Sequence, residues 1–211
     1  MADVSGKSLP GMLVMLMTRD IVKAAAYKFD SPDKILCEIN SALKENIKPG
    51  MFVTMFFGIF EKSTSKFRFA SAGHNPLIWY DSLKNECKLI KTKGYPLGMM
   101  PDNVFSGRIE LRQIELSVND LIVQYTDGIN EAQNPDGEEY GLDRFVDSIK
   151  ASASSDVEVV SNGVLEGLNV FVRNAEQYDD ITLLTVKWLG FNAVESREFE
   201  KQVKSAYANS D

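Results

Sequence analysis

The most informative stretch of the sequence is residues 121–132, which read LIVQYTDGINEA. Its first half, Leu121 to Thr126, is mostly apolar and predicts a buried strand. The pair Asp127-Gly128 follows at once, so the sequence places a carboxylate where this strand ends. An Asp-Gly pair after a strand is by itself typical of a turn. Whether Asp127 does more depends on what the rest of the chain brings to the same place.

Strand patterns on both sides of this stretch predict antiparallel sheets. Residues 52–60 are almost continuously apolar, as expected of a strand covered on both faces. Turn residues separate the remaining strand segments at hairpin-like spacings, and such short connections favour antiparallel pairing. We interpret Asp102-Asn103 as one of these turns. Further strands are predicted at residues 67–69, 77–80, 88–91, 108–116 and 181–188.

Two helices are predicted before the strands. The first runs from Pro10 onward, where apolar residues recur at spacings of three and four. The second begins with Ser31 as its N-cap and Pro32 at the first helical position, where the missing N–H costs nothing. Lys48-Pro49-Gly50 ends it.

Further helices are predicted after the strands. Residues 142–149 carry one apolar stripe, and Ser155 with Glu158 forms a capping box that opens a second helix. Asn192 with Glu195 caps a final helix. This order of elements predicts the α+β class, as a sandwich of antiparallel sheets with helices outside.

The composition describes one globular domain with an excess of acidic residues. The 211 residues are 44% hydrophobic, enough for a sizeable core. Asp and Glu number 30 against 23 Lys and Arg. We therefore expect no nucleic-acid partner, because binding to a phosphate backbone needs clustered basic residues. A single histidine, His74, and two cysteines, Cys37 and Cys87, nearly exclude a zinc cluster.

No segment predicts export or a membrane span. Gly11 to Met17 is apolar, but Arg19-Asp20 follows closely, and a spanning helix needs about 20 apolar residues. Two isolated cysteines suit a reducing compartment. We therefore expect a cytoplasmic protein that makes no membrane contact.

Three acidic positions are candidates for chemistry: Asp3, Asp127 and the pair Asp179-Asp180 before the last strand. Carboxylates at strand ends sit on rigid supports and can converge at one rim of a sheet. Mg²⁺ and Mn²⁺ prefer such oxygen ligands, and two ions held together can activate a water and stabilise phosphate charge. Each position also has a plainer interpretation, as a frayed terminus, a turn and a solvated start of a strand respectively.

An ordered series of motifs decides between these interpretations. The motifs are Asp3-Val4-Ser5-Gly6-Lys7, Ala72-Gly73-His74-Asn75-Pro76, Pro96-Leu97-Gly98, Tyr125 to Ala132, Gly141-Leu142 and Asp179-Asp180-Ile181-Thr182. With them the chain resembles the SpoIIE/RsbU branch of the metal-dependent type-2C protein serine/threonine phosphatases. The resemblance runs from residue 2 to about residue 188.

The resemblance implies a fold, a reaction and a site. The fold is a sandwich of two antiparallel sheets flanked by helix pairs. The reaction is hydrolysis of phosphoserine or phosphothreonine by a water bound to two Mn²⁺ or Mg²⁺ ions. The implied catalytic residues and metal ligands are Asp3, Asp127 and Asp179, the backbone carbonyl of Val4 is a further ligand, and Gly128 leaves room beside the metal.

The resemblance also implies partners. The substrate would be a phosphorylated bacterial regulatory protein of the anti-sigma-factor-antagonist type. The first two helices would form a regulatory surface and a homodimer contact. Upstream sensor domains are expected in a longer chain.

One departure from the family pattern shapes our expectations. The family places a Gly-Asp-x-x-Asp-like motif on a strand before the Asp3 segment, and its aspartate bridges both metals. Because the sequence begins at Met1, we expect the first strand to be missing from an N-terminally truncated phosphatase-like domain over residues 1–189, followed by a C-terminal helical extension over 190–211. We then expect an incomplete site with at most one ordered ion, little activity, and an Asp3 that swings away.

Two alternatives stay open at the level of sequence. His74 is either a general acid for the leaving group or a ring that stabilises its bend. The domain is either a phosphatase or a catalytically impaired module that binds a signalling partner. The retained Asp3, Asp127 and Asp179 favour the phosphatase, and the missing bridging aspartate favours the binding module.

Overall fold

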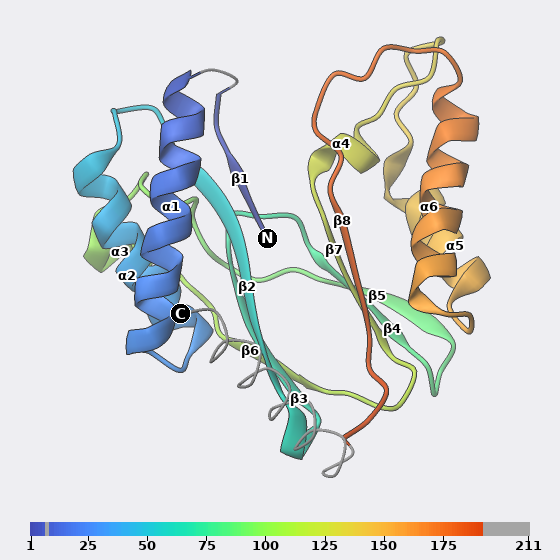
Figure 1. Cartoon of the computed structure of the whole chain (residues 1–211), viewed down its shortest axis with the longest axis horizontal. Helices are drawn as coiled ribbons and strands as arrows, with labels where there is room; N and C mark the ends of the chain where they lie inside the picture. Colours follow the sequence, from blue (N-terminus) through green and yellow to red (C-terminus); the bar gives the residue numbers. More distant parts are fainter. Residues whose placement is uncertain (7–8, 192–211) are drawn as a thin grey trace, which may run out of the picture.

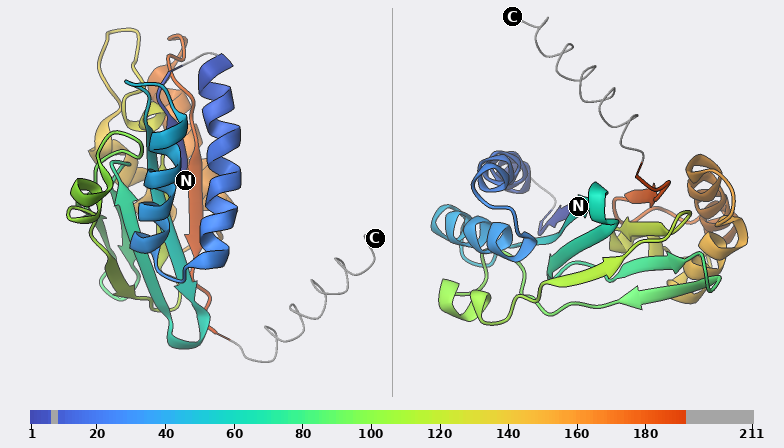
Figure 2. Two further views of the ribbon diagram at one scale, coloured as in Figure 1. Left: turned by 90° about the vertical axis from the view of Figure 1, so that its left-hand side faces the viewer. Right: turned by 90° about the horizontal axis from the view of Figure 1, so that it is seen from below.

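The computed structural model describes residues 1–6 and 9–191. Two four-stranded antiparallel sheets face each other, and a group of helices covers the outer face of each sheet (Figure 1, Figure 2). The α+β class and the sandwich of two sheets flanked by helix pairs, both predicted from the sequence, are confirmed. The short connections of the sequence indeed join antiparallel neighbours.

The first sheet has the strand order β1-β2-β3-β6. Its edge strand β1 consists of Ala2–Val4 and pairs with β2, with Asp3 opposite Thr54 and Val4 opposite Val53. The other strands are β2 (Val53–Glu61), β3 (Lys66–Ala72) and β6 (Arg112–Glu115). Asp3, which we expected to swing away, therefore lies in a regular strand, because β2 supplies hydrogen-bond partners for its backbone.

The second sheet has the order β5-β4-β7-β8. Residues 121–125 form β7, which lies between β4 and β8 and is buried at every position. This explains its nearly continuous apolar sequence. The strands are β4 (Leu77–Asp81), β5 (Glu86–Ile90), β7 (Leu121–Tyr125) and β8 (Leu183–Lys187).

The helices largely follow the predicted order. The long ones are α1 (Leu9–Lys28), α2 (Pro32–Asn46), α5 (Gly141–Ser152) and α6 (Val157–Val172), and the short ones are η1 (Lys62–Thr64), α3 (Asp102–Ser106) and α4 (Asp127–Asn130). Helix α2 begins at Pro32 after Ser31, as predicted. The predicted capping box at Ser155 is wrong, because Asp156 occupies the N-cap position of α6.

The interpretation of Asp102-Asn103 as a turn is also wrong. These residues begin the single-turn helix α3. Long-range contacts favour the helix over a turn, since Phe105 is buried in the core beneath α2 and Asn40 Nδ2 donates a hydrogen bond of 2.8 Å to Asp102 Oδ1. A five-residue segment does not carry enough periodicity to reveal this from sequence.

Three apolar clusters hold the layers together. One lies between α1, α2 and the first sheet, a second between the second sheet and the pair α5 and α6, and a third between the two sheets. The cluster between the sheets consists of Phe56, Phe67, Phe69, Leu77, Leu116, Ile122 and Trp188. Burial of these side chains fixes the distance between the sheets and hence between the residues at their rims.

No helix among residues 1–6 and 9–191 is long and apolar enough to cross a membrane. Cys37 and Cys87 are free thiols that pack against different clusters. The predicted final helix, capped at Asn192, lies outside the described residues.

Candidate functional site

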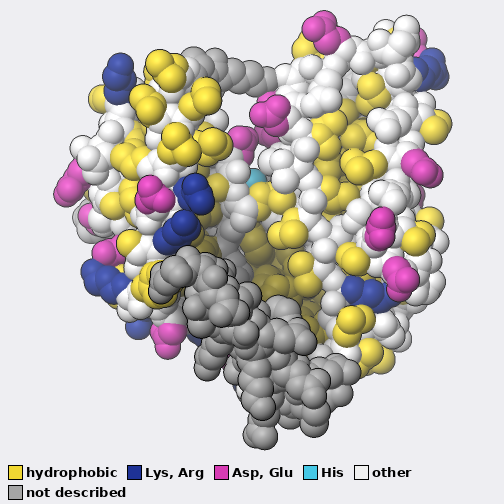
Figure 3. Space-filling model, in the orientation of Figure 1, with side chains coloured by type: hydrophobic (Ala, Val, Ile, Leu, Met, Phe, Trp, Pro, Cys, Tyr) yellow, Lys and Arg dark blue, Asp and Glu magenta, His cyan; other side chains and the backbone are white. Residues whose placement is uncertain are grey.

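A cleft of about 740 Å³ is lined by residues of both sheets, among them those of β1 and the residues that directly follow β7. All four predicted site residues line it: Asp3, Val4, Asp127 and Asp179. In Figure 3 the cleft is a hollow between the two helix groups, with acidic side chains at its rim and the only histidine of the chain inside it. The structure therefore brings together positions that are up to 176 residues apart in sequence (Asp3 to Asp179).

Asp3 reaches the cleft from the first sheet. Its pKa is raised above the usual value, first by loss of hydration and then by repulsion from Asp127, with smaller contributions from Asp179 and Asp180. The repulsion shows that the carboxylates from the two sheets are close enough to interact. A cation placed between them would relieve it.

Asp127 and Asp179 reach the cleft from the second sheet. Asp127 is the first residue of α4, directly after β7, so it begins a helix at a place where an isolated Asp-Gly pair is typical of a turn. Thr126 fastens the two acidic segments: its hydroxyl donates to the Asp180 carbonyl at 2.9 Å and accepts from the Thr182 N–H at 2.9 Å. The sequence analysis missed this role of Thr126, although its place beside Asp127 was a signal.

Gly128 is required by the close approach of these segments. A Cβ at this position would lie 2.4 Å from the carbonyl oxygen of Asp180 and 3.3 Å from that of Asp179. The backbone of the Asp179-Asp180 pair therefore occupies the space beside the Gly128 Cα. The resemblance to the family implied that this glycine leaves room for a metal.

The bend at His74 and Asn75 forms the floor between the two sides. His74 Nδ1 and Thr54 Oγ1 share a hydrogen bond of 2.9 Å, and Asn75 Nδ2 donates to the Tyr125 carbonyl at 3.3 Å. Burial, and to a lesser extent the positive N-terminus, lowers the pKa of His74 from 6.5 to about 4. His74 is thus neutral at physiological pH, which does not favour a role as general acid.

The motif Pro96-Leu97-Gly98 supports the site from behind. Leu97 exchanges two backbone hydrogen bonds with Val53, of 3.1 and 2.8 Å. Val53 is also the partner of Val4 in β1. Buried Asn40 holds the motif in place by accepting a hydrogen bond of 3.0 Å from the Gly98 N–H. The motif therefore anchors the strand that carries the partners of Asp3 and Val4.

Glu131 is a further acidic residue at the site that the sequence analysis did not single out. Its pKa is raised by loss of hydration and then by repulsion from Asp127, Glu139 and Asp179. It lines a second cavity of about 510 Å³, which shares Asp179 with the cleft. The signal was its position in the Asp127 to Ala132 motif.

The donor chemistry of the cleft fits a hard divalent cation. Asp3, Asp127 and Asp179 offer carboxylate oxygens, and the backbone offers carbonyl oxygens, the ligands that Mg²⁺ and Mn²⁺ prefer. The mutual repulsion at Asp3 is what a cation would neutralise. Within the described part of the chain, no three His, Cys, Asp or Glu side chains are already gathered around one point as a metal site.

The comparison with known proteins agrees with this geometry. Residues 1–189 match the family described as Stage II sporulation protein E (SpoIIE). The chain belongs to the SpoIIE family. The resemblance drawn from the motifs is thereby confirmed.

Individual relatives of this SpoIIE-family chain are phosphatases. Phosphoserine phosphatase RsbU of Bacillus subtilis (strain 168) is 27% identical over 190 residues, which cover 88% of this chain and 54% of RsbU. The chain thus spans about half the length of RsbU. The SiaA-PP2C domain of Pseudomonas aeruginosa superimposes with a TM-score of 0.75 at 20% identity, covering 89% of this chain and 73% of that one.

A third similar protein carries information on metals. RsbX, solved in complex with magnesium, superimposes with a TM-score of 0.58 at 19% identity, over 87% of this chain and 77% of that one. The SpoIIE fold is therefore found in proteins that hold a divalent metal.

Proposed function

We propose that this chain is a metal-dependent protein phosphatase domain that hydrolyses phosphoserine or phosphothreonine. The observation that carries the proposal is the convergence of Asp3 from one sheet with Asp127 and Asp179 from the other on a single cleft. Membership of the SpoIIE family and the similarity to phosphoserine phosphatase RsbU support it.

In this proposal Asp3, Asp127, Asp179 and the Val4 carbonyl hold Mn²⁺ or Mg²⁺, two ions in the intact family site. The bound metal supplies a water of lowered pKa and stabilises the charge of the phosphoryl group. The remaining work falls to the residues of the chain. Thr126 and Gly128 keep the Asp127 and Asp179 segments together, and the β1–β2 pairing presents Asp3 to them.

We further propose a phosphorylated regulatory protein of the anti-sigma-factor-antagonist type as the substrate, and sensor domains as neighbours in a longer chain. The similarity to RsbU supports both. A homodimer through the first two helices fits the exposed apolar face of α1. The residues of this face that are more than half exposed are Leu9, Met12, Leu13, Met15 and Leu16. The cytoplasmic location stays a prediction.

A catalytically impaired binding module is the second candidate. It is favoured by the absence, among residues 1–6 and 9–191, of a preassembled group of three metal-binding side chains. Such a module would bind a phosphoprotein partner without turnover at any Mn²⁺ concentration.

The deciding experiment measures release of phosphate from a phosphoserine peptide by the full chain, with Mn²⁺ and with EDTA. Turnover, even if slow, should require Mn²⁺ and should be lost in Asp127→Asn and Asp179→Asn. Calorimetry should show Mn²⁺ affinity reduced by about tenfold or more in both variants, as expected when a charged ligand is lost. Asp136→Asn, in a turn away from the cleft, is the matched control and should leave both quantities unchanged. Unchanged Mn²⁺ affinity in the first two variants would refute the assignment.

A further inference from the structure

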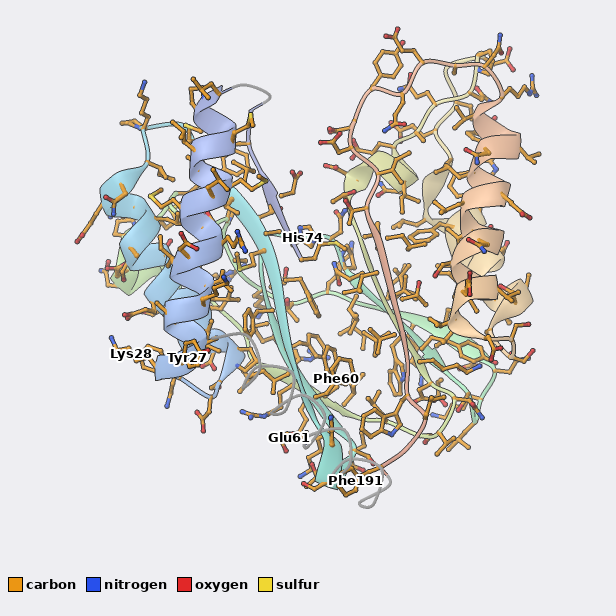
Figure 4. All side chains as sticks on the ribbon, in the orientation of Figure 1. Tyr27, Lys28, Phe60, Glu61, His74 and Phe191 are labelled. Carbon is orange, nitrogen blue, oxygen red and sulfur yellow. The ribbon has the colours of Figure 1, made fainter. Side chains whose placement is uncertain are left out.

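His74 is the residue of the cleft whose role is not explained by the proposed metal ligands. It lies near the centre of the molecule, between β1 and the second sheet (Figure 4). Its bend is rigid: Gly73 has a φ of +70°, and a Cβ there would lie 2.7 Å from Pro96 Cγ. The His74 N–H donates to Ser71 Oγ at 3.1 Å, and the Ser71 hydroxyl donates to the His74 carbonyl at 3.2 Å. The ring is therefore carried by a backbone that is already fixed without it.

The imidazole acts on the side of the cleft that carries Asp3. His74 Nδ1 shares the 2.9 Å hydrogen bond with Thr54 Oγ1. Thr54 is directly opposite Asp3 in the β1–β2 ladder, and opposite residues of an antiparallel pair point to the same face with their Cβ atoms about 5 Å apart. Both side chains line the cleft. The ring thus holds the side chain of the residue directly opposite Asp3 in the ladder.

The next residue, Asn75, forms hydrogen bonds on the side of the cleft that carries Asp127. Asn75 donates to the Tyr125 carbonyl at 3.3 Å, and its own carbonyl accepts from Gln124 Nε2 at 2.9 Å. Tyr125 ends β7, two residues before Asp127. One dipeptide therefore connects the support of Asp3 in the first sheet with the support of Asp127 in the second.

The other ring nitrogen of His74, Nε2, is in an unfavourable environment. His74 Nε2 is buried and has no hydrogen-bond partner within the described part of the chain. Leaving a buried polar atom unpaired costs about 1–3 kcal/mol. An apolar ring would fill the same space without this cost, so the fold by itself does not explain a histidine here.

We propose that His74 is a positioning residue of the reaction: through Thr54 it sets the placement of Asp3 relative to Asp127, and thereby the affinity of the cleft for metal. This inference rests on the proposed phosphatase function, since it assigns a task within the same site. It differs from bend stabilisation, because Ser71 and Gly73 hold the bend while the imidazole holds Thr54.

The test is a double-mutant cycle on the full chain with Mn²⁺ affinity as the readout. His74→Phe keeps an aromatic ring without the nitrogens, and Thr54→Val removes only the hydroxyl. Each should lower Mn²⁺ affinity about three- to tenfold, the effect of one lost hydrogen bond, and the double variant should be no weaker than either single one. His74→Asn, whose amide reaches the position of Nδ1, should recover most of the affinity.

Ser148→Ala is the matched control, because it removes a hydroxyl that shares a hydrogen bond of 2.7 Å with Tyr140 Oη and does not line the cleft. It should lower stability in urea and leave the Mn²⁺ affinity of the folded protein unchanged. Full Mn²⁺ affinity in His74→Phe, or additive losses in the double variant, would overturn the inference while leaving the phosphatase proposal intact. No Mn²⁺ binding by the unmodified chain would overturn both.

Discussion

Asp127 and Asp179 are held by segments that hydrogen-bond to each other, whereas Asp3 is held by a strand of only three residues. On the first side, Thr126 makes three hydrogen bonds to Asp180 and Thr182. On the other side, β1 pairs with β2 alone within the described residues. The half of the site that carries Asp127 and Asp179 is thus held by hydrogen bonds between the two segments themselves. The half that carries Asp3 depends on the pairing of β1 with β2.

This contrast teaches where sensitivity to mutation should be greatest. Changes around Thr126 and Gly128 disturb two carboxylates at once, because these residues join both segments. Changes around β1 disturb one carboxylate, that of Asp3, together with the neighbouring Val4 carbonyl. The following predictions test this asymmetry, from the largest expected effect to the smallest.

Gly128→Ala should have the largest effect. The new Cβ would lie 2.4 Å from the Asp180 carbonyl, so backbone must move, and we expect the free energy of unfolding to fall by about 3 kcal/mol. Urea denaturation measures it. Gly163→Ala in α6 is the control. Its Cβ would meet only Ser152 Oγ, at 3.5 Å, so the change should be neutral or stabilising.

Gly11→Ala provides the counterpart on the weaker side. A Cβ at Gly11 would also lie 2.4 Å from a carbonyl, that of Gly6, next to β1. Because a short edge strand can move at lower cost than the joined segments, its destabilisation should be smaller than that of Gly128→Ala. A loss of stability in Gly11→Ala that equals or exceeds that in Gly128→Ala would contradict this difference between the two sides.

Thr126→Val should have the next largest effect. The valine keeps the shape but leaves the Asp180 carbonyl and the Thr182 N–H without their partner, which should cost about 1–2 kcal/mol and weaken Mn²⁺ binding. Ser5→Ala on the β1 side removes one acceptor, that of the Phe52 N–H, and should cost less than about 1 kcal/mol. Denaturation curves of both variants, with Thr126→Ser as the conservative control, decide whether this order holds.

The titration of His74 should have the smallest effect at neutral pH, and its effect should appear only as the pH falls. Because the pKa of His74 falls from 6.5 to about 4 on folding, the unfolded chain binds the proton more readily between these values. His74 therefore contributes stability that is complete above about pH 6.5 and is lost as the pH falls toward 4. Without metal, His74→Phe should show a weaker decline of stability over this range than the unmodified chain, measured by urea denaturation at several pH values. Parallel declines would contradict the assigned pKa.

The sequence was most informative where a pattern is long or local. The apolar run before Asp127 predicted β7, and Pro32 marked the start of α2, because burial and backbone constraints act on adjacent residues. Short elements were missed. Helix α3 depends on the long-range contacts of Asn40 and Phe105, and the N-cap of α6 lies one residue beyond the predicted Ser155.

By itself, the sequence determined the α+β class and the acidic residues of the candidate site, since these follow from periodicity and from motifs of adjacent residues. Only the tertiary structure decided how Asp3 meets Asp127 and Asp179, why Gly128 must lack a side chain, and how His74 and Asn75 connect the two sheets. The physical reason is that these contacts join distant segments, and their geometry is set by how the apolar clusters pack the two sheets together.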